Sequence, residues 1–211
     1  MVSEAGVKTG DDGSAPARMR RLRLARLAAS IVGGAFALAL GACASSPLET
    51  YELGAVPLEV ASQPKLSVIS VEEPSAPAIL ATNRIAIRRG STDYAYLAGA
   101  QWSNVLTQLV QRRLMESFEN AHLFRAVAET GTASDYILST DIRRFEVSGD
   151  QAVVEIAVRL VVARTGRTLR GTVVTGTAPS PTSGAAGITA AIDTAFGQAA
   201  DKILRFAVSR T

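Results

Sequence analysis

The clearest candidate for covalent chemistry in this 211-residue chain is the tetrapeptide Leu40-Gly41-Ala42-Cys43, which contains the only cysteine. A thiol can take up a diacylglyceryl group as a thioether, and the small residues Gly41 and Ala42 leave room for a peptidase to cut between Ala42 and Cys43. Cleavage frees an amine on Cys43 that a second acyl chain, such as palmitate, can modify. This lipobox pattern predicts a lipoprotein anchored through a diacylglycerol and an N-acyl chain on Cys43, because two or three chains give stable anchoring.

The residues before Cys43 have the order of a secretory signal. Five arginines between positions 18 and 26 precede the uncharged run 31–40, so residues 1–42 are predicted to be removed as a signal peptide. The start of translation could be Met19, because Glu4, Asp11 and Asp12 do not suit a basic signal region. One alternative stays open: the uncharged stretch 27–48 is long enough for a transmembrane helix followed by a free cysteine.

Processing changes the charge of the chain. The full sequence has 22 basic and 19 acidic residues, but residues 1–42 hold six of the bases and three of the acids, which leaves 16 of each. A neutral mature chain offers no basic field for a nucleic-acid backbone. Its 169 residues suffice for one domain with a real core, which must fold without an internal disulfide.

Hydrophobic spacing predicts the elements of that domain. We expect strands at 51–56, 66–71, 83–88 and 123–127, helices at 101–119 and 184–208, and three long strands at 135–147, 151–163 and 169–177. The long strands would form an antiparallel meander, and a change of phase in the first predicts a bulge near Arg143 or Arg144. Trp102 would anchor a helix face in the core. The predicted fold is α+β: a single domain (51–211) behind a lipidated tether (43–50), with a mixed, mainly antiparallel sheet covered by two amphipathic helices.

Catalytic groups are scarce in the sequence. His122 is the only histidine, so a histidine metal cluster is excluded, and a capping or surface role is the simpler interpretation. The sequence contains no Gly-x-Ser-x-Gly elbow, P-loop or Gly-x-Gly-x-x-Gly motif. The segment 183–187 could present amides to an anion but is interpreted as the loop before a helix, and Asp141 and Glu146 are interpreted as solvated strand residues. We therefore expect no catalytic residues, no metal and no cofactor.

A series of short motifs follows the lipobox. They are Tyr51-Glu52-Leu53, Asn83-Arg84-Ile85-Ala86-Ile87, Tyr94 followed by Trp102 with Leu106, Leu109 and Leu114, then Phe124, Asp135-Tyr136-Ile137-Leu138, Arg143-Arg144-Phe145-Glu146, Arg159-Leu160-Val161 and Thr165-Gly166-Arg167. Each is weak alone. In this order, over nearly all of the mature chain, they resemble the family of ABC-type transport auxiliary lipoproteins, which is related to the lipoprotein of the paraquat-inducible system.

The resemblance implies a non-catalytic lipoprotein, lipid-anchored on the periplasmic face of the Gram-negative outer membrane. Ala44 agrees, since an Asp after the cysteine retains enteric lipoproteins in the inner membrane. Its implied partners are a mammalian-cell-entry (MCE) type substrate-binding protein and an inner-membrane ABC transporter, in a system that moves phospholipid or related lipids between the membranes. A homo-oligomer is also compatible. Two other functions stay open: an envelope structural or regulatory lipoprotein, such as a cell-wall synthase activator or complex-assembly factor, and a lipid-anchored hydrolase.

Overall fold

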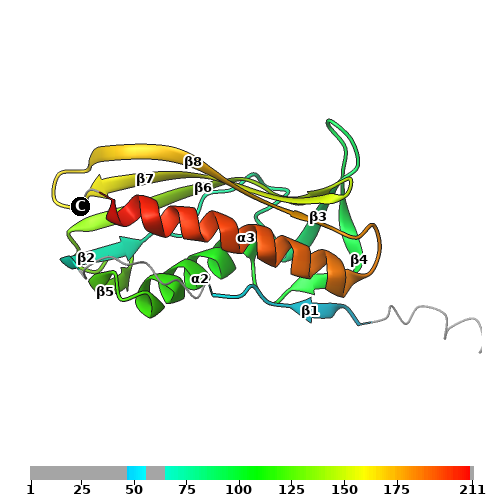
Figure 1. The fold of residues 1–211 in the computed structure, drawn as a ribbon, viewed down its shortest axis with the longest axis horizontal. Helices are drawn as coiled ribbons and strands as arrows, with labels where there is room; N and C mark the ends of the chain where they lie inside the picture. Colours follow the sequence, from blue (N-terminus) through cyan, green and yellow to red (C-terminus); the bar gives the residue numbers. More distant parts are fainter. Residues whose placement is uncertain (1–46, 56–64, 210–211) are drawn as a thin grey trace, which may run out of the picture. The chain divides into compact units, whose positions relative to one another are not determined.

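A computed structural model of the chain describes residues 47–55 and 65–209, so the lipobox at Cys43 lies outside the described residues. The described chain has the predicted α+β architecture, with one mixed eight-stranded sheet and two helices (Figure 1). In chain order the elements are β1 (Glu49–Tyr51), β2 (Lys65–Val71), β3 (Arg84–Arg88), β4 (Tyr94–Trp102), α2 (Leu106–Asn120), β5 (Phe124–Glu129), β6 (Tyr136–Ser148), β7 (Gln151–Val162), β8 (Arg167–Pro179) and α3 (Ala185–Val208).

The sheet is organised around β6. One edge of β6 pairs antiparallel with β7, and β7 pairs antiparallel with β8, which confirms the predicted meander. The other edge is shared by two shorter parallel strands: β2 lies opposite residues 136–138, and β3 lies opposite residues 146–148. Beyond them, β5 pairs parallel with β2, β4 pairs antiparallel with β3, and β1 pairs parallel with β4.

A β-bulge in β6 decides which side chains face the core. The β6–β7 register shifts between Ile142 and Arg144, as the change of phase predicted. Because of this shift, Ile142 before the bulge and Phe145 after it are both buried in the same core. Arg144 and Glu146, which alternate with Phe145, are thereby directed to the opposite, outer face of the sheet.

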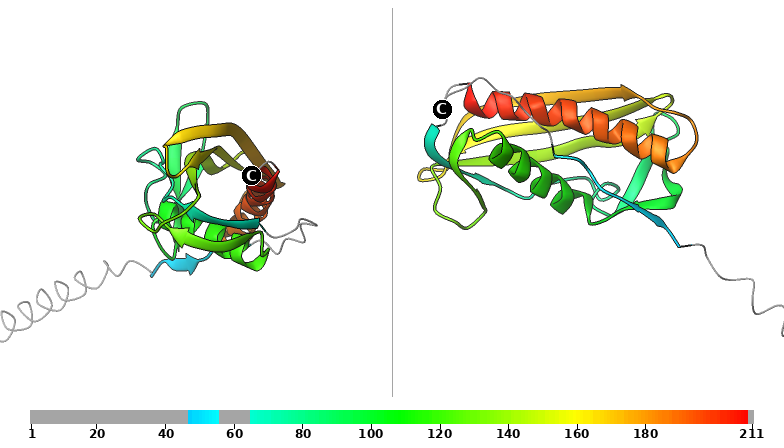
Figure 2. Two further views of the ribbon diagram at one scale, coloured as in Figure 1. Left: turned by 90° about the vertical axis from the view of Figure 1, so that its left-hand side faces the viewer. Right: turned by 60° about the horizontal axis from the view of Figure 1, so that its bottom comes forward.

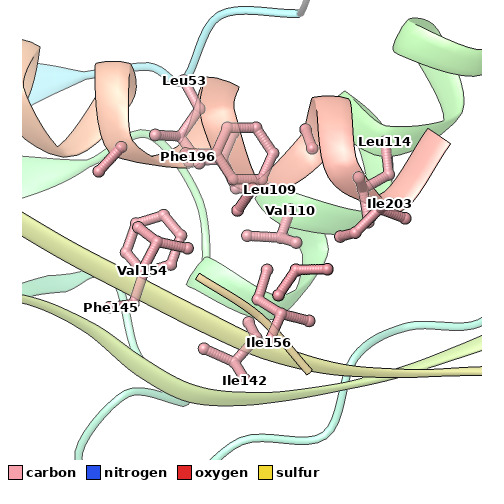
Figure 3. Close-up of a cluster of buried hydrophobic side chains, with 14 of the residues drawn as sticks. Leu53, Leu109, Val110, Leu114, Ile142, Phe145, Val154, Ile156, Phe196 and Ile203 are labelled. Atoms are coloured by element: carbon pink, nitrogen blue, oxygen red, sulfur yellow. The ribbon is translucent and has the colours of Figure 1, made fainter. Parts of the chain in front are cut away.

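Both helices pack on the inner face of the sheet, as the sequence predicted. The sheet curves around them, with α3 lying along β8 and β7 and α2 near β2 and β5 (Figure 2). Side chains from α2, α3 and the long strands meet in one apolar cluster (Figure 3). Trp102 is buried and packs edge-on against Phe145, with ring centroids 6.1 Å apart, which confirms its predicted place in the core.

The close approach of α3 to β8 depends on Gly176. A Cβ atom added at this position would lie 1.9 Å from the carbonyl oxygen of Ala195, so no side chain fits there. The neighbouring residues on this face of α3 are also small, with Ala195 and Ala199 fully buried. Glycine on the strand and alanine on the helix together let the two backbones pack in contact.

The strand β4 was missed by the sequence prediction, and the start of the first helix was placed too early. Residues 101 and 102 end β4, and α2 begins only at Leu106. The alternation in β4 is interrupted at Gly99, which has a φ of 73° and lies where the β3–β4 register shifts. The predicted first strand also differs, since β1 covers Glu49–Tyr51 rather than 51–56.

The residues after β1 are fastened to the domain at three points. Leu53 is buried beside Phe196 (Figure 3), the amide of Gly54 donates to Asp193 Oδ1 at 2.7 Å, and Glu52 pairs with Arg113 at 2.6 Å. Residues 47–211 form a compact unit with their own closed core. We therefore expect residues 47–211 to fold without residues 1–46.

Candidate functional site

The outer face of β3, β4 and β6 carries a cluster of charged and aromatic side chains that we call the arginine–tyrosine patch: Arg84, Arg88, Tyr94, Tyr96, Arg144 and Glu146. Alternation places them together, because Ala86 is opposite both Tyr96 on β4 and Glu146 on β6. Arg84 and Arg144 each lie two residues before that row on adjacent parallel strands. The patch therefore combines three strands that are distant in sequence.

Glu146 is the centre of the patch. Its side chain is 0% exposed, so the sequence-based expectation of a solvated strand residue was wrong. Its Oε1 atom accepts hydrogen bonds from Arg144 Nε at 2.9 Å and from Arg88 Nη1 at 3.4 Å. Oε2 is buried without a hydrogen-bond partner among the described residues. A buried carboxylate requires such cationic partners, because removal from water disfavours its charge.

Arg88 is held in place from several sides. It donates to Glu146, to the hydroxyl of Tyr94 at 3.1 Å and to the backbone carbonyls of Gly90 and Ser91, and it stacks over the ring of Tyr94. Burial raises the pKa of Tyr94, and the negative charge of Glu146 adds to this effect. Tyr94 therefore acts as a neutral hydroxyl and a stacking surface, which excludes a role as a phenolate base near neutral pH.

Arg84 differs from the other two arginines because it has no carboxylate partner among the described residues. Its guanidinium lies 5.1 Å from the ring centroid of Tyr96, and its Nε is buried without a hydrogen-bond partner in this part of the chain. Tyr96 is in turn fixed by a hydrogen bond from its hydroxyl to the carbonyl of Ile79. The patch therefore presents preorganised guanidinium groups rather than an acid–base pair, and such groups are suited to recognising anions.

A second polar region lies beside α2. A groove of about 530 Å³ is lined by four carboxylates, one arginine and neutral side chains, namely Glu73, Glu116, Glu119, Glu129, Arg112, Gln108, Gln111 and Met115. Glu73 accepts a hydrogen bond from Thr107 at 2.5 Å, and Glu116 pairs with Arg113 at 2.6 Å. These contacts fasten α2 to its surroundings, and an acidic surface of this kind is an ordinary solvated helix face.

The residues singled out from the sequence are not brought together. The predicted cleavage and lipidation residues Ala42 and Cys43 lie outside the described residues. His122 is exposed in the turn after α2, with a φ of 49°. Gly184, with a φ of 91°, forms the loop immediately before α3. Asp141 accepts a hydrogen bond from Ser75 at 2.6 Å, whereas Glu146 pairs with arginines, so the two carboxylates do not act as a pair.

Residues 47–55 and 65–209 contain neither a metal-binding cluster nor a membrane-spanning helix. No cluster of three or more His, Cys, Asp or Glu side chains is arranged to hold a metal ion there. Among the same residues, no helix combines the length and the apolar character that a membrane span requires. The alternative of a transmembrane helix at 27–48 falls almost wholly outside this range.

Comparison with known proteins identifies relatives of the whole domain. The profile of a family described as "ABC-type transport auxiliary lipoprotein component" matches residues 51–204. An uncharacterized protein of Bradyrhizobium diazoefficiens is 31% identical over 145 residues, which are 66% of this chain and 39% of that protein. This chain thus spans about two fifths of the length of that relative.

Solved structures show the same fold. A crystal structure of a Xanthomonas campestris protein superposes with a TM-score of 0.70 and 24% identity, covering 76% of this chain and 95% of that one. A second crystal structure, of an uncharacterized protein, gives a TM-score of 0.63 at 16% identity, covering 77% and 99% of the two chains. At these identities the likeness supports the architecture alone.

Proposed function

The chain belongs to the family of ABC-type transport auxiliary lipoprotein components, and from this membership we propose that it is a non-catalytic, lipid-anchored accessory of an ABC transport system in the cell envelope. The observation that carries the proposal is the match over residues 51–204, which spans nearly the whole described domain. The finer parts of the proposal are acylation of Cys43, location on the periplasmic face of the outer membrane, and service to an MCE-type system that moves phospholipid or related lipids.

The contacts within the domain support an auxiliary role over an enzymatic one. Its buried carboxylate, Glu146, is engaged by Arg144 and Arg88, and the histidine at position 122 is exposed on a turn. Among the residues that the structure describes, neither group has the neighbours that a nucleophile or a general base requires. The ionic contacts instead hold strands and helices in place, as expected of a domain that works by binding.

Acylation is tested by mass spectrometry of the protein purified from membranes of its native host. We expect the mature chain to start at Cys43 with the mass of a diacylglyceryl group and one further acyl chain. A Cys43→Ser variant should keep the signal peptide and lack both additions. An unmodified thiol on an uncleaved chain would instead support the transmembrane alternative and refute the lipoprotein assignment.

Partnership is tested by affinity purification of the acylated chain from detergent-solubilised envelopes after chemical crosslinking. We expect an MCE-type protein and components of an ABC transporter to be enriched, relative to an unrelated lipoprotein carrying the same tag. Enrichment of cell-wall synthases without any transporter component would contradict the proposal and favour the regulatory alternative.

A further inference from the structure

We propose that the arginine–tyrosine patch docks the domain onto the anionic phospholipid headgroups of the membrane that holds its anchor. The proposal rests on the acylation of Cys43 proposed above for the identity of that membrane. It extends that function by giving the tethered domain a defined orientation, with the outer face of the β3–β4–β6 region against the lipid surface.

The charge of this region is the first reason. Arg89 and Asp93 lie in the exposed hairpin beside the patch, and Glu155, which is opposite Arg144 on β7, pairs with Arg143 at 3.9 Å. The five arginines and three carboxylates of this region, Glu146, Asp93 and Glu155, leave a net charge of +2. The mature chain as a whole is neutral, so this excess is local. Glu146 is fully buried, whereas Arg88 and Arg144 keep 26% and 33% of their side-chain surface exposed. The patch therefore presents positive charge to solvent and buries its central negative charge.

The chemistry of the side chains favours phosphate as the anion. Guanidinium groups bind phosphate oxygens through two parallel hydrogen bonds, which a lysine does not do. Arg84 is the clearest candidate, since it has no carboxylate partner among the described residues and its guanidinium lies 5.1 Å from the ring centroid of Tyr96. Tyrosine rings beside the guanidinium groups suit the headgroup region, where amphipathic aromatic side chains are stable.

The position of the tether is the third reason. β1 runs parallel to β4, with Glu49 opposite Ala100 and Tyr51 opposite Trp102. Because this pairing is parallel, β1 begins on the side of Ala100 that leads back along β4 toward Tyr94, where β4 begins. Five residues separate Cys43 from Glu49, and the six residue steps between them span at most about 20 Å. A tether of this length would keep the folded domain close to the membrane that holds an acylated Cys43.

The test uses residues 47–211, which lack Cys43 and so cannot bind through acyl chains. Cosedimentation is measured with vesicles of phosphatidylcholine alone and of phosphatidylcholine mixed with phosphatidylglycerol. The test variant is Arg84→Gln/Arg89→Gln, since neither side chain pairs with Glu146 among the described contacts and folding should be retained. The matched control is Arg125→Gln/Arg164→Gln, which removes the same charge from exposed positions on β5 and on the β7–β8 turn.

We expect binding only to vesicles with phosphatidylglycerol, falling with salt. Each arginine near an anionic surface strengthens binding about fivefold, so the test variant should bind about 25-fold more weakly while the control changes little. Equal losses in both variants, or no vesicle binding, would overturn the proposal. The proposal would also be overturned if NMR showed chemical-shift changes at the patch when inorganic phosphate alone is added, because these would indicate a soluble anion as the ligand. Any of these failures would leave the mass of the acylated chain and its partners unaffected.

Discussion

Replacing Arg144 should destabilise the domain more than replacing Glu146, the buried carboxylate with which it pairs. Glu146 is 0% exposed, whereas the Arg144 side chain is 33% exposed. Replacing Arg144 by Gln leaves a buried charge whose remaining cationic partner among the described residues is Arg88 at 3.4 Å. We therefore expect the free energy of unfolding to fall by about 3 kcal/mol, at the low end for a broken buried pair. Replacing Glu146 by Gln leaves a guanidinium that water can reach, and we expect a loss of about 1 kcal/mol.

The double variant separates this explanation from a loss of packing. Once residue 146 is neutral, removing Arg144 should cost little more, so Arg144→Gln/Glu146→Gln should be about 2 kcal/mol more stable than Arg144→Gln alone. Urea denaturation of residues 47–211 measures these free energies of unfolding, with an unchanged slope as evidence that the native state is intact. The reasoning is refuted if Arg144→Gln is no more destabilising than Glu146→Gln, or if the two losses simply add.

Two further predictions concern packing and pH. Gly176→Ala should destabilise the domain by about 3 kcal/mol or more in the same urea assay, because its Cβ would meet a backbone oxygen of α3, whereas Gly90→Ala, with open space around its Cβ, should be neutral. Hydrogen bonds from Ser103 and then from Arg113 lower the pKa of Glu52, and the charge of Arg113 adds to this effect. The ionised form of Glu52 therefore stabilises the folded state above the unfolded pKa of about 4.5, and this effect is lost as pH falls through the lower folded value. Glu52→Gln should therefore cost at most about 1 kcal/mol at pH 7, and its difference from wild type should disappear in acid; a difference that grows in acid would contradict this assignment.

The long strands and α3 could be predicted from the sequence because their signals are local. In β7 the alternating residues Val154, Ile156 and Val158 are all buried, and the pattern alone places them on one face. The bulge in β6 was also predictable, since a one-residue change of phase moves every later side chain to the other face. For such elements burial follows directly from spacing.

β4 could not be predicted because its signal is weak. Its middle is rich in alanine and contains Gly99 in a left-handed conformation, so neither alternation nor β-branched residues mark it. It is stabilised by its neighbours, with β3 on one side and β1 on the other. The helical spacing of Trp102 with Leu106 was real but misleading, because Trp102 reaches the same core from the end of a strand.

The burial of Glu146 depends on tertiary contacts and could not be predicted from its local sequence. Residue 146 alternates with Phe145 and so faces outward, where a glutamate is ordinarily solvated. It is covered because the parallel pairing of β3 with β6 brings Arg88 beside it, and the hairpin after β3 fixes Arg88 through Gly90 and Ser91. A partial signal was present: Arg84 and Arg88 alternate with Ile85 and Ile87, which places both arginines on one face.

The fold also limits which surfaces of the sheet can serve as a docking face. The inner face is covered by α2 and α3. β8 is a 13-residue strand whose one partner strand among the described residues is β7. Side chains of α3 contact its backbone, with Lys202 Nζ donating to the carbonyl of Thr175 at 2.6 Å and Gln198 Oε1 accepting from the amide of Thr177 at 3.2 Å. An edge strand engaged in this way is protected against pairing with another chain. Among the described residues neither helix packs on the outer face of β3, β4 and β6, which carries Arg84, Arg88 and Arg144, so this is the face of the sheet left for the proposed docking.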